Sequence, residues 1–288
     1  MGLFSKKKSN ETVKSEQIVK TSSEKTDKKK KVKDKHILCD HLSFAAKESY
    51  KRLRTNVVFS FPDEGVCRVL GITSAQPSEG KSITSVNLAY SLAGLEKKVL
   101  VIDADLRRSS LHKKLDLPQS PGLSNLLVNV SDVSTVVSTC NYTNDVSFDV
   151  ITGGDIPPNP SELLISERMA KLFEALKSNY DYIIVDLPPV CAVVDALSVS
   201  TNLDGMIIVI REQYTTKKAI EYCVEQMSFS NTKILGFVVN GSLEGAGKKY
   251  GYGKYGYRKY GYGYGYGYGY GYGYRYGKKY NTNYGYYK

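Results

Sequence analysis

The sequence predicts a doubly wound α/β domain with a mostly parallel sheet, flanked by two basic segments. Three observations predict it. Short apolar runs alternate with longer helical patterns from residue 36 to 244, several runs are continuously apolar, and the first run leads into a phosphate-binding loop. Continuous apolar runs are typical of parallel strands that helices cover on both faces. One P-loop NTPase domain of ordinary size is expected at 36–244, between an arm at 1–35 and a tail at 245–288.

The expected strands are short runs rich in β-branched and apolar residues, at 68–73, 98–102, 147–152, 182–186, 205–210 and 233–239. The expected helices have apolar residues at helical spacing and Ser or Thr near their starts, at 82–95, 161–179 and 215–229. Because strands and helices alternate along the chain, each helix is expected to connect parallel strands.

The arm carries twelve lysines against five acidic residues and few large apolar side chains, which predicts a solvated, flexible segment. Two interpretations remain open: a solubilising extension, or lysine clusters at 6–8 and 28–31 that lie against an anionic membrane. The net charge of +11 divides into +7 in the arm, +9 at 248–288 and −5 between them. A folded domain with a negative balance argues against specific nucleic-acid binding.

The tail holds seventeen of the twenty-four tyrosines and no acidic residue between 248 and 288. Glycine at every second position and the absence of Val, Ile and Leu predict that this segment builds no packed core. The recurring feature is a phenol hydroxyl on an open backbone, so phosphorylation is expected on these tyrosines: Tyr250, Tyr252, Tyr255, Tyr257, Tyr260, Tyr262, Tyr264, Tyr266, Tyr268, Tyr270, Tyr272, Tyr274, Tyr276, Tyr280, Tyr284, Tyr286 and Tyr287.

Cysteine usage and hydropathy exclude several classes of protein. The five cysteines are scattered and form no C-x-x-C pair, which favours a reducing, cytoplasmic environment. No His/Cys cluster has the spacing of zinc ligands. The sequence contains no apolar stretch of 18 residues and no signal-peptide core, so we expect a chain that neither spans a membrane nor is secreted by that route.

A Walker A loop follows the first expected strand and precedes the first expected helix, which is the context that supports such a motif. Its backbone amides and the helix N-terminus are expected to hold the phosphates of ATP. Lys81 is expected to reach the β and γ oxygens, and Ser82 to hold Mg²⁺. The predicted nucleotide-binding residues are Ala75, Gln76, Pro77, Ser78, Glu79, Gly80, Lys81, Ser82 and Ile83.

Acidic residues follow two further strands. Asp103, Asp105 and Arg107 come just after the run at 98–102, and Asp186 ends the run at 182–186. Since the carboxyl edges of parallel strands form the ligand crevice, these residues are expected near the Walker A loop. Asp105 and Asp186 are predicted to serve Mg²⁺, and Asp103 to accept the proton of an attacking hydroxyl. The alternative is that Asp103 or Asp105 caps the next helix.

Together these motifs resemble the Walker A, A′ and B set of the bacterial tyrosine kinases that regulate capsule and exopolysaccharide synthesis. The resemblance extends to the L-R-T-N core within 50–59, the P-P-N-P-S-E-L-L segment at 157–164 and the tyrosine-rich tail. It implies a kinase that uses ATP and Mg²⁺ and autophosphorylates in trans within a ring of subunits. It also implies a Gram-positive split form, cytoplasmic and recruited to the inner face of the membrane by an adaptor whose tail completes the active site. A tyrosine phosphatase is a further implied partner.

The family's oligomerisation motif, E-x-x-R-x-x-R, corresponds here to Glu48, Lys51 and Arg54. Lysine in the middle keeps the charge but loses the bidentate fork, so a weaker ring, or one that uses Arg52, is expected. A solvated amphipathic helix is the alternative.

Other interpretations stay open. A ParA- or MinD-like ATPase shares the expected fold, but it carries a signature lysine where this chain has Gln76. A nucleotide-binding scaffold with a sticky Gly/Tyr tail is a second rival. Asn240 is a candidate contact for the adenine edge or a turn residue before Gly241, and Arg211 a candidate contact for phosphate or a surface ion pair.

Overall fold

The computed structural model describes residues 42–63, 65–129, 131–141 and 146–241. Both basic segments, with the seventeen tail tyrosines, lie outside the described residues. Within the described ranges, seven strands form one sheet in the order β3-β4-β2-β5-β1-β6-β7. Their bounds are β1 Arg68–Ser74, β2 Val99–Asp103, β3 Val137–Asn141, β4 Ser147–Ile151, β5 Tyr182–Asp186, β6 Gly205–Arg211 and β7 Ile234–Asn240.

Every neighbouring pair in the sheet is parallel except β3 and β4. This confirms the predicted fold class. All six expected strands are present, with ends that move by one residue at most, but the sequence analysis missed β3. The reason is that β3 is a half-exposed edge strand of sequence V-S-T-C-N, which lacks the apolar run that marks a buried strand.

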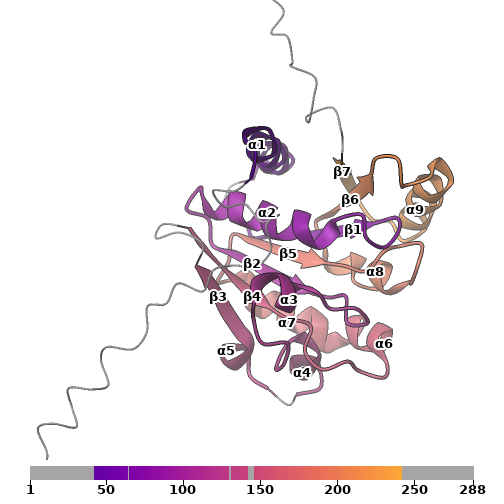
Figure 1. Cartoon of the computed structure of the whole chain (residues 1–288). Coiled ribbons are helices and arrows are strands. Elements are labelled where there is room, and N and C mark those ends of the chain that lie inside the picture. The colour runs from indigo at the N-terminus through magenta and orange to yellow at the C-terminus, as the bar shows by residue number, and fades with distance from the viewer. Residues whose placement is uncertain (1–41, 64, 130, 142–145, 242–288) are drawn as a thin grey trace, which may run out of the picture. The chain divides into compact units, whose positions relative to one another are not determined.

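Helices cover both faces of the sheet (Figure 1). On one face, α1 (Phe44–Phe59), α2 (Lys81–Ala93) and α3 (Leu111–Leu115) contribute to one buried cluster. On the other face, α4 (Leu123–Leu127), α6 (Pro160–Leu164), α7 (Glu167–Lys177), α8 (Asp195–Ser198) and α9 (Lys217–Phe229) contribute to a second. Two short elements, α5 (Val133–Val136) and the 3₁₀ helix η1 (Ser200–Asn202), complete the described fold.

The predicted single helix at 161–179 is wrong, because two helices occupy this stretch. Helix α6 ends at Leu164, and Ser166 begins α7 by accepting a hydrogen bond from the Met169 backbone N–H. The apolar spacing continues across the break, so periodicity alone did not reveal the serine cap.

Candidate active site

The Walker A loop connects β1 to α2 at the carboxyl edge of the sheet, as predicted. Ser78 and Gly80 adopt left-handed backbone conformations, with φ of 66° and 99°. The φ of Gly80 favours glycine, and a Cβ atom there would lie 2.0 Å from the Asn240 Nδ2 and would displace that amide. Helix α2 begins immediately afterwards at Lys81, which places its N-terminus where phosphate would bind.

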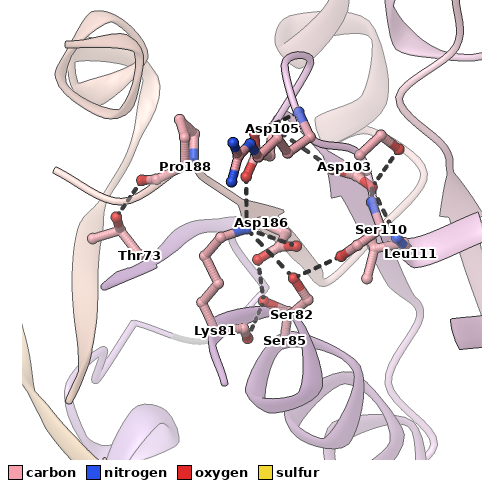
Figure 2. Close-up of polar contacts among 12 residues, drawn as sticks. Thr73, Lys81, Ser82, Ser85, Asp103, Asp105, Ser110, Leu111, Asp186 and Pro188 are labelled. Atoms are coloured by element: carbon pink, nitrogen blue, oxygen red, sulfur yellow. Dashed lines mark hydrogen bonds and ion pairs between the residues drawn. The ribbon is translucent and has the colours of Figure 1, made fainter. Parts of the chain in front are cut away.

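The Lys81 ammonium lies among the predicted metal ligands (Figure 2). Its Nζ is 3.1 Å from Asp105 Oδ2, 3.5 Å from Asp186 Oδ2 and 3.4 Å from Ser82 Oγ. Burial alone would lower the pKa of Lys81, but the charges of Asp186, Asp105 and Asp103 outweigh it, and the pKa is raised. The lysine is therefore fully charged and neutralises a buried acidic cluster.

Asp186 ends β5 with no exposed surface. Burial raises the pKa of its carboxyl, and the Lys81 charge lowers it in part. Ser85 donates a hydrogen bond to Oδ1 at 3.2 Å, whereas Oδ2 is buried and accepts none. This oxygen accepts no hydrogen bond and faces the Lys81 ammonium at 3.5 Å, next to a second carboxylate and a hydroxyl, so it fits a position where a hard cation such as Mg²⁺ would bind.

Metal binding here does not need a cage of protein side chains. Among the described residues, no group of three or more His, Cys, Asp and Glu side chains is placed to hold a metal ion. Mg²⁺ usually keeps several waters and binds one or two carboxylates together with substrate phosphates. Ser82, Asp105 and Asp186 would supply the protein's share, and the bound ion would neutralise phosphate charge.

Asp103 is completely buried at the end of β2 and accepts several hydrogen bonds. Its Oδ2 accepts from the Ser109 hydroxyl at 2.8 Å and from the backbone N–H groups of Ser110 and Leu111 at 3.0 Å each. Burial, and then the charge of Asp186, raise the pKa of Asp103 to about 6. The carboxylate thus satisfies amides at the start of α3, which the capping alternative anticipated, while its pKa suits a base near neutral pH.

Three serines that the sequence analysis missed connect these groups. Ser85 lies one helical turn after Lys81 on α2 and contacts Asp186, a position that helical spacing could have indicated. Ser109 contacts Asp103, and Ser110 donates a hydrogen bond from its hydroxyl to Ser82 Oγ at 3.1 Å. No sequence signal marks either of these two, because their roles depend on how the loop after β2 folds back.

A second hydrogen-bond network, around Glu79, holds the Walker A loop. Glu79 is fully buried, accepts a hydrogen bond from the Gln76 backbone N–H at 2.9 Å, and accepts another from the Thr215 hydroxyl. Asn240 donates from Nδ2 to the Glu79 carbonyl at 3.0 Å, and Arg211 donates to the Ser78 carbonyl at 3.4 Å. Asn240 and Arg211 therefore contact the loop backbone here, and the adenine contact stays a prediction.

Arg107 of the predicted A′ motif makes a forked ion pair with Asp195, another residue that the sequence analysis missed. Its Nε and Nη2 donate to the two carboxylate oxygens at 2.7 and 3.3 Å. Asp195 is only 1% exposed and also accepts a hydrogen bond from Ser161 at 2.5 Å. The pair joins the loop after β2 to the starts of α6 and α8.

The residues of the predicted oligomerisation motif lie on α1. Lys51 pairs with Glu48 of the same helix at 2.7 Å, and both side chains are largely exposed. Arg54 instead faces α2 and donates to the Ser91 carbonyl at 3.0 Å. Arg54 thus anchors α1 to the domain in this structure, and its part in a ring stays a prediction.

Comparisons with known proteins agree with this site. A family profile described as an AAA domain matches residues 67–234. The tyrosine-protein kinase YwqD of Bacillus subtilis (strain 168) is 39% identical over 205 residues, which cover 71% of this chain and 85% of the relative. The kinase domain of the Escherichia coli tyrosine kinase ETK is 36% identical with a TM-score of 0.66, over 72% of this chain and 80% of that chain.

A more distant likeness concerns the fold alone. The septum site-determining protein MinD of Pyrococcus horikoshii is 20% identical with a TM-score of 0.50, over 60% of this chain and 70% of that chain. The named relatives at higher identity are tyrosine kinases, so the comparisons support the kinase interpretation over the ATPase-switch alternative.

Proposed function

The chain belongs to the bacterial tyrosine-protein kinases with an AAA-type P-loop domain, and from this membership we propose that it phosphorylates its own C-terminal tyrosines in trans. The observation that carries the proposal is the meeting of Lys81, Ser82, Asp105 and Asp186 at one sheet edge, with Asp103 beside them. In-line phosphoryl transfer needs mainly positioning and charge neutralisation, which this set supplies with Mg²⁺.

Each residue has a defined task in this proposal. The Walker A amides and Lys81 bind the phosphates of ATP, while Asp105, Asp186 and Ser82 hold Mg²⁺. Asp103 accepts the proton of the tyrosine hydroxyl, which is needed because only about one free tyrosine in a thousand is ionised at neutral pH.

The tail suits delivery to a neighbouring subunit. For a glycine-rich sequence of about 40 residues, random-coil statistics give a root-mean-square span of roughly 35 Å. Each phosphate adds about −1.5 to −2 charges, so roughly five would cancel the tail's positive charge. Seventeen similar acceptors favour a graded switch of charge, in which the number of phosphates matters more than any one site.

We further propose that this switch regulates capsular or extracellular polysaccharide synthesis and export. The kinase would work at the inner face of the membrane with an adaptor that activates it, as a homo-oligomer, and a tyrosine phosphatase would reset it. Within the described residues no helix has the length and apolarity of a membrane span.

The test is phosphotyrosine formation by the full chain, incubated with ATP, Mg²⁺ and membranes from its own organism lacking the native copy, which supply the adaptor. Lys81→Met is expected to abolish labelling. The matched control is Lys171→Met, since Lys171 is 73% exposed and only pairs with Glu167 on its own helix. Undiminished phosphotyrosine in the Lys81→Met protein would refute the proposal, and ATP binding without any phosphotyrosine would favour the scaffold alternative.

A mixing experiment tests transfer in trans. The acceptor is the full-length Lys81→Met chain, and the donor is an active chain that ends after β7 and has no tail. Labelled acceptor is the expected result. If the acceptor stays unlabelled, while active full-length chains incubated separately do become labelled, transfer in trans is wrong.

A further inference from the structure

Ser110 contacts two parts of the candidate active site at once (Figure 2). Its backbone N–H donates to Asp103 Oδ2 at 3.0 Å, and its hydroxyl donates to Ser82 Oγ at 3.1 Å. Asp103 ends β2, whereas Ser82 lies in the first turn of α2, so Ser110 bridges the predicted base and the predicted metal ligand.

The Ser110 hydroxyl is not used for helix capping. Ser110 occupies the N-cap position of α3, where a serine side chain commonly accepts a backbone hydrogen bond, yet it makes no such bond. The hydroxyl is turned toward Ser82 instead. A purely local role in starting α3 therefore does not account for its orientation.

Hydrogen-bond valence shows what this contact does to Ser82. A serine oxygen has one proton to donate and two lone pairs that accept. One lone pair accepts the Ser110 hydrogen bond, and the Lys81 Nζ lies 3.4 Å from the same oxygen. Ser82 is only 6% exposed, so bulk water has little access to exchange with these partners.

The Lys81 ammonium marks the position that a cation favours. It also lies 3.1 Å from Asp105 Oδ2 and 3.5 Å from Asp186 Oδ2. Together with Ser82 Oγ, three oxygen atoms therefore surround one positive charge. With Lys81 directed to the phosphates of ATP, the second lone pair of Ser82 would be free to bind Mg²⁺. The hydrogen bond from Ser110 would hold the Ser82 oxygen in the orientation that this requires.

We propose that Ser110 is a positioning residue of the cation site. It orients Ser82 toward Mg²⁺ and fixes the position of Ser82 relative to Asp103. This inference rests on the proposed function, since it assumes that ATP and Mg²⁺ bind at the Walker A loop. Ser110 itself need not touch the metal.

The experiment compares Ser110→Thr with Ser110→Val in the full chain. The two side chains have nearly the same shape, and only threonine retains the hydroxyl. Equilibrium binding of a fluorescent ATP analogue is titrated with Mg²⁺ and repeated in EDTA. This measures the metal requirement without relying on turnover.

Ser110→Val is expected to need about three- to tenfold more Mg²⁺ for half-maximal binding than Ser110→Thr, because one hydrogen bond is worth about that factor. Binding in EDTA should be the same for both variants, and wild type should behave like Ser110→Thr. The inference would be overturned if the two variants needed the same Mg²⁺ concentration. It would also be overturned if Ser110→Val bound the nucleotide as much more weakly than Ser110→Thr in EDTA as it does with Mg²⁺. If wild type binds no nucleotide at any Mg²⁺ concentration, the proposed function fails before the variants are compared.

Discussion

Replacing Lys81 with methionine should destabilise the nucleotide-free protein as well as inactivate it. Lys81 is 12% exposed, and its ammonium contacts Asp105 and Asp186, which are 7% and 0% exposed at their side chains. Methionine has a similar length but no charge. The substitution therefore leaves a cluster of buried carboxylates without their cation.

The expected magnitude follows from the charges. An ammonium and a carboxylate about 4 Å apart attract by roughly 4 kcal/mol at an effective dielectric constant of 20, and desolvation offsets part of this. Removing one partner of a buried pair typically costs about 3–5 kcal/mol. One of the unpaired carboxylates can bind a proton, which reduces the electrostatic cost. We therefore expect the free energy of unfolding to fall by about 2–4 kcal/mol at neutral pH.

Thermal or urea unfolding of the full chain, without nucleotide or Mg²⁺, measures this loss. It corresponds to a fall in Tm of about 5–15 °C for a domain of this size. The loss should shrink as pH falls from 7 to 5. Carboxyls whose folded pKa is raised, such as Asp103 at about 6, favour the folded state when protonated and lose that contribution as pH rises through the folded pKa.

The matched control places Lys81→Met in an Asp105→Asn background. Removing one carboxylate should make the lysine substitution less costly, by about 1 kcal/mol or more in a double-mutant cycle. Lys171→Met should change stability by no more than about 0.5 kcal/mol, since its ion pair is exposed. A Lys81→Met protein as stable as wild type at neutral pH, or one whose deficit is the same at pH 5, would refute the electrostatic reasoning.

Three further predictions concern the same crevice. Because the pKa of Asp103 is raised to about 6 in the nucleotide-free protein, kcat/KM for tyrosine phosphorylation should fall roughly tenfold per unit below that pH, measured as a pH–rate profile. Gly80→Ala should cost about 1–3 kcal/mol in urea unfolding, because φ is 99° and the new Cβ meets the Asn240 amide. Asp195→Ala should cost about 1–3 kcal/mol, because it removes the hydrogen bonds that Arg107 and Ser161 donate to a buried carboxylate.

Each has its own control. A rate that stays flat from pH 7 to 5 would exclude Asp103 as the base. Gly94→Ala should be nearly neutral, since Gly94 has φ of −65° and a Cβ there would have its nearest neighbours at 3.6 Å. If Asp195→Ala costs as much in an Arg107→Ala background as in wild type, the forked ion pair does not carry the effect.

Much of the fold could be predicted because its signals are local. The apolar runs of β1, β2, β5 and β6 are continuous, and the Walker A loop lies between β1 and α2 as expected. The two predictions of secondary structure that failed also have local causes. Strand β3 has a polar sequence because it lies at an edge, and the break between α6 and α7 rests on one serine cap.

The site shows the same division. The rule that ligands bind at the carboxyl ends of parallel strands brought Lys81, Asp105 and Asp186 together correctly. It did not predict the hydrogen bonds between Ser110 and Ser82 or between Arg107 and Asp195. The residues of these pairs are separated by 28 and 88 residues and belong to no shared motif. The hold of Asp103 on the start of α3 corresponds to the capping alternative that helix-start chemistry had left open.

The sequence by itself determined the chemistry that this protein can perform: the loop and acidic strand ends of a phosphate-binding site, and a separate segment of tyrosines on a glycine-rich backbone. These features can be recognised in the sequence because neighbouring residues encode each of them. Only the tertiary structure decided which charges neutralise each other and which hydroxyl faces which ligand. Such contacts depend on distances of a few ångströms between segments far apart in the chain, and packing of the whole sheet and its helices sets those distances.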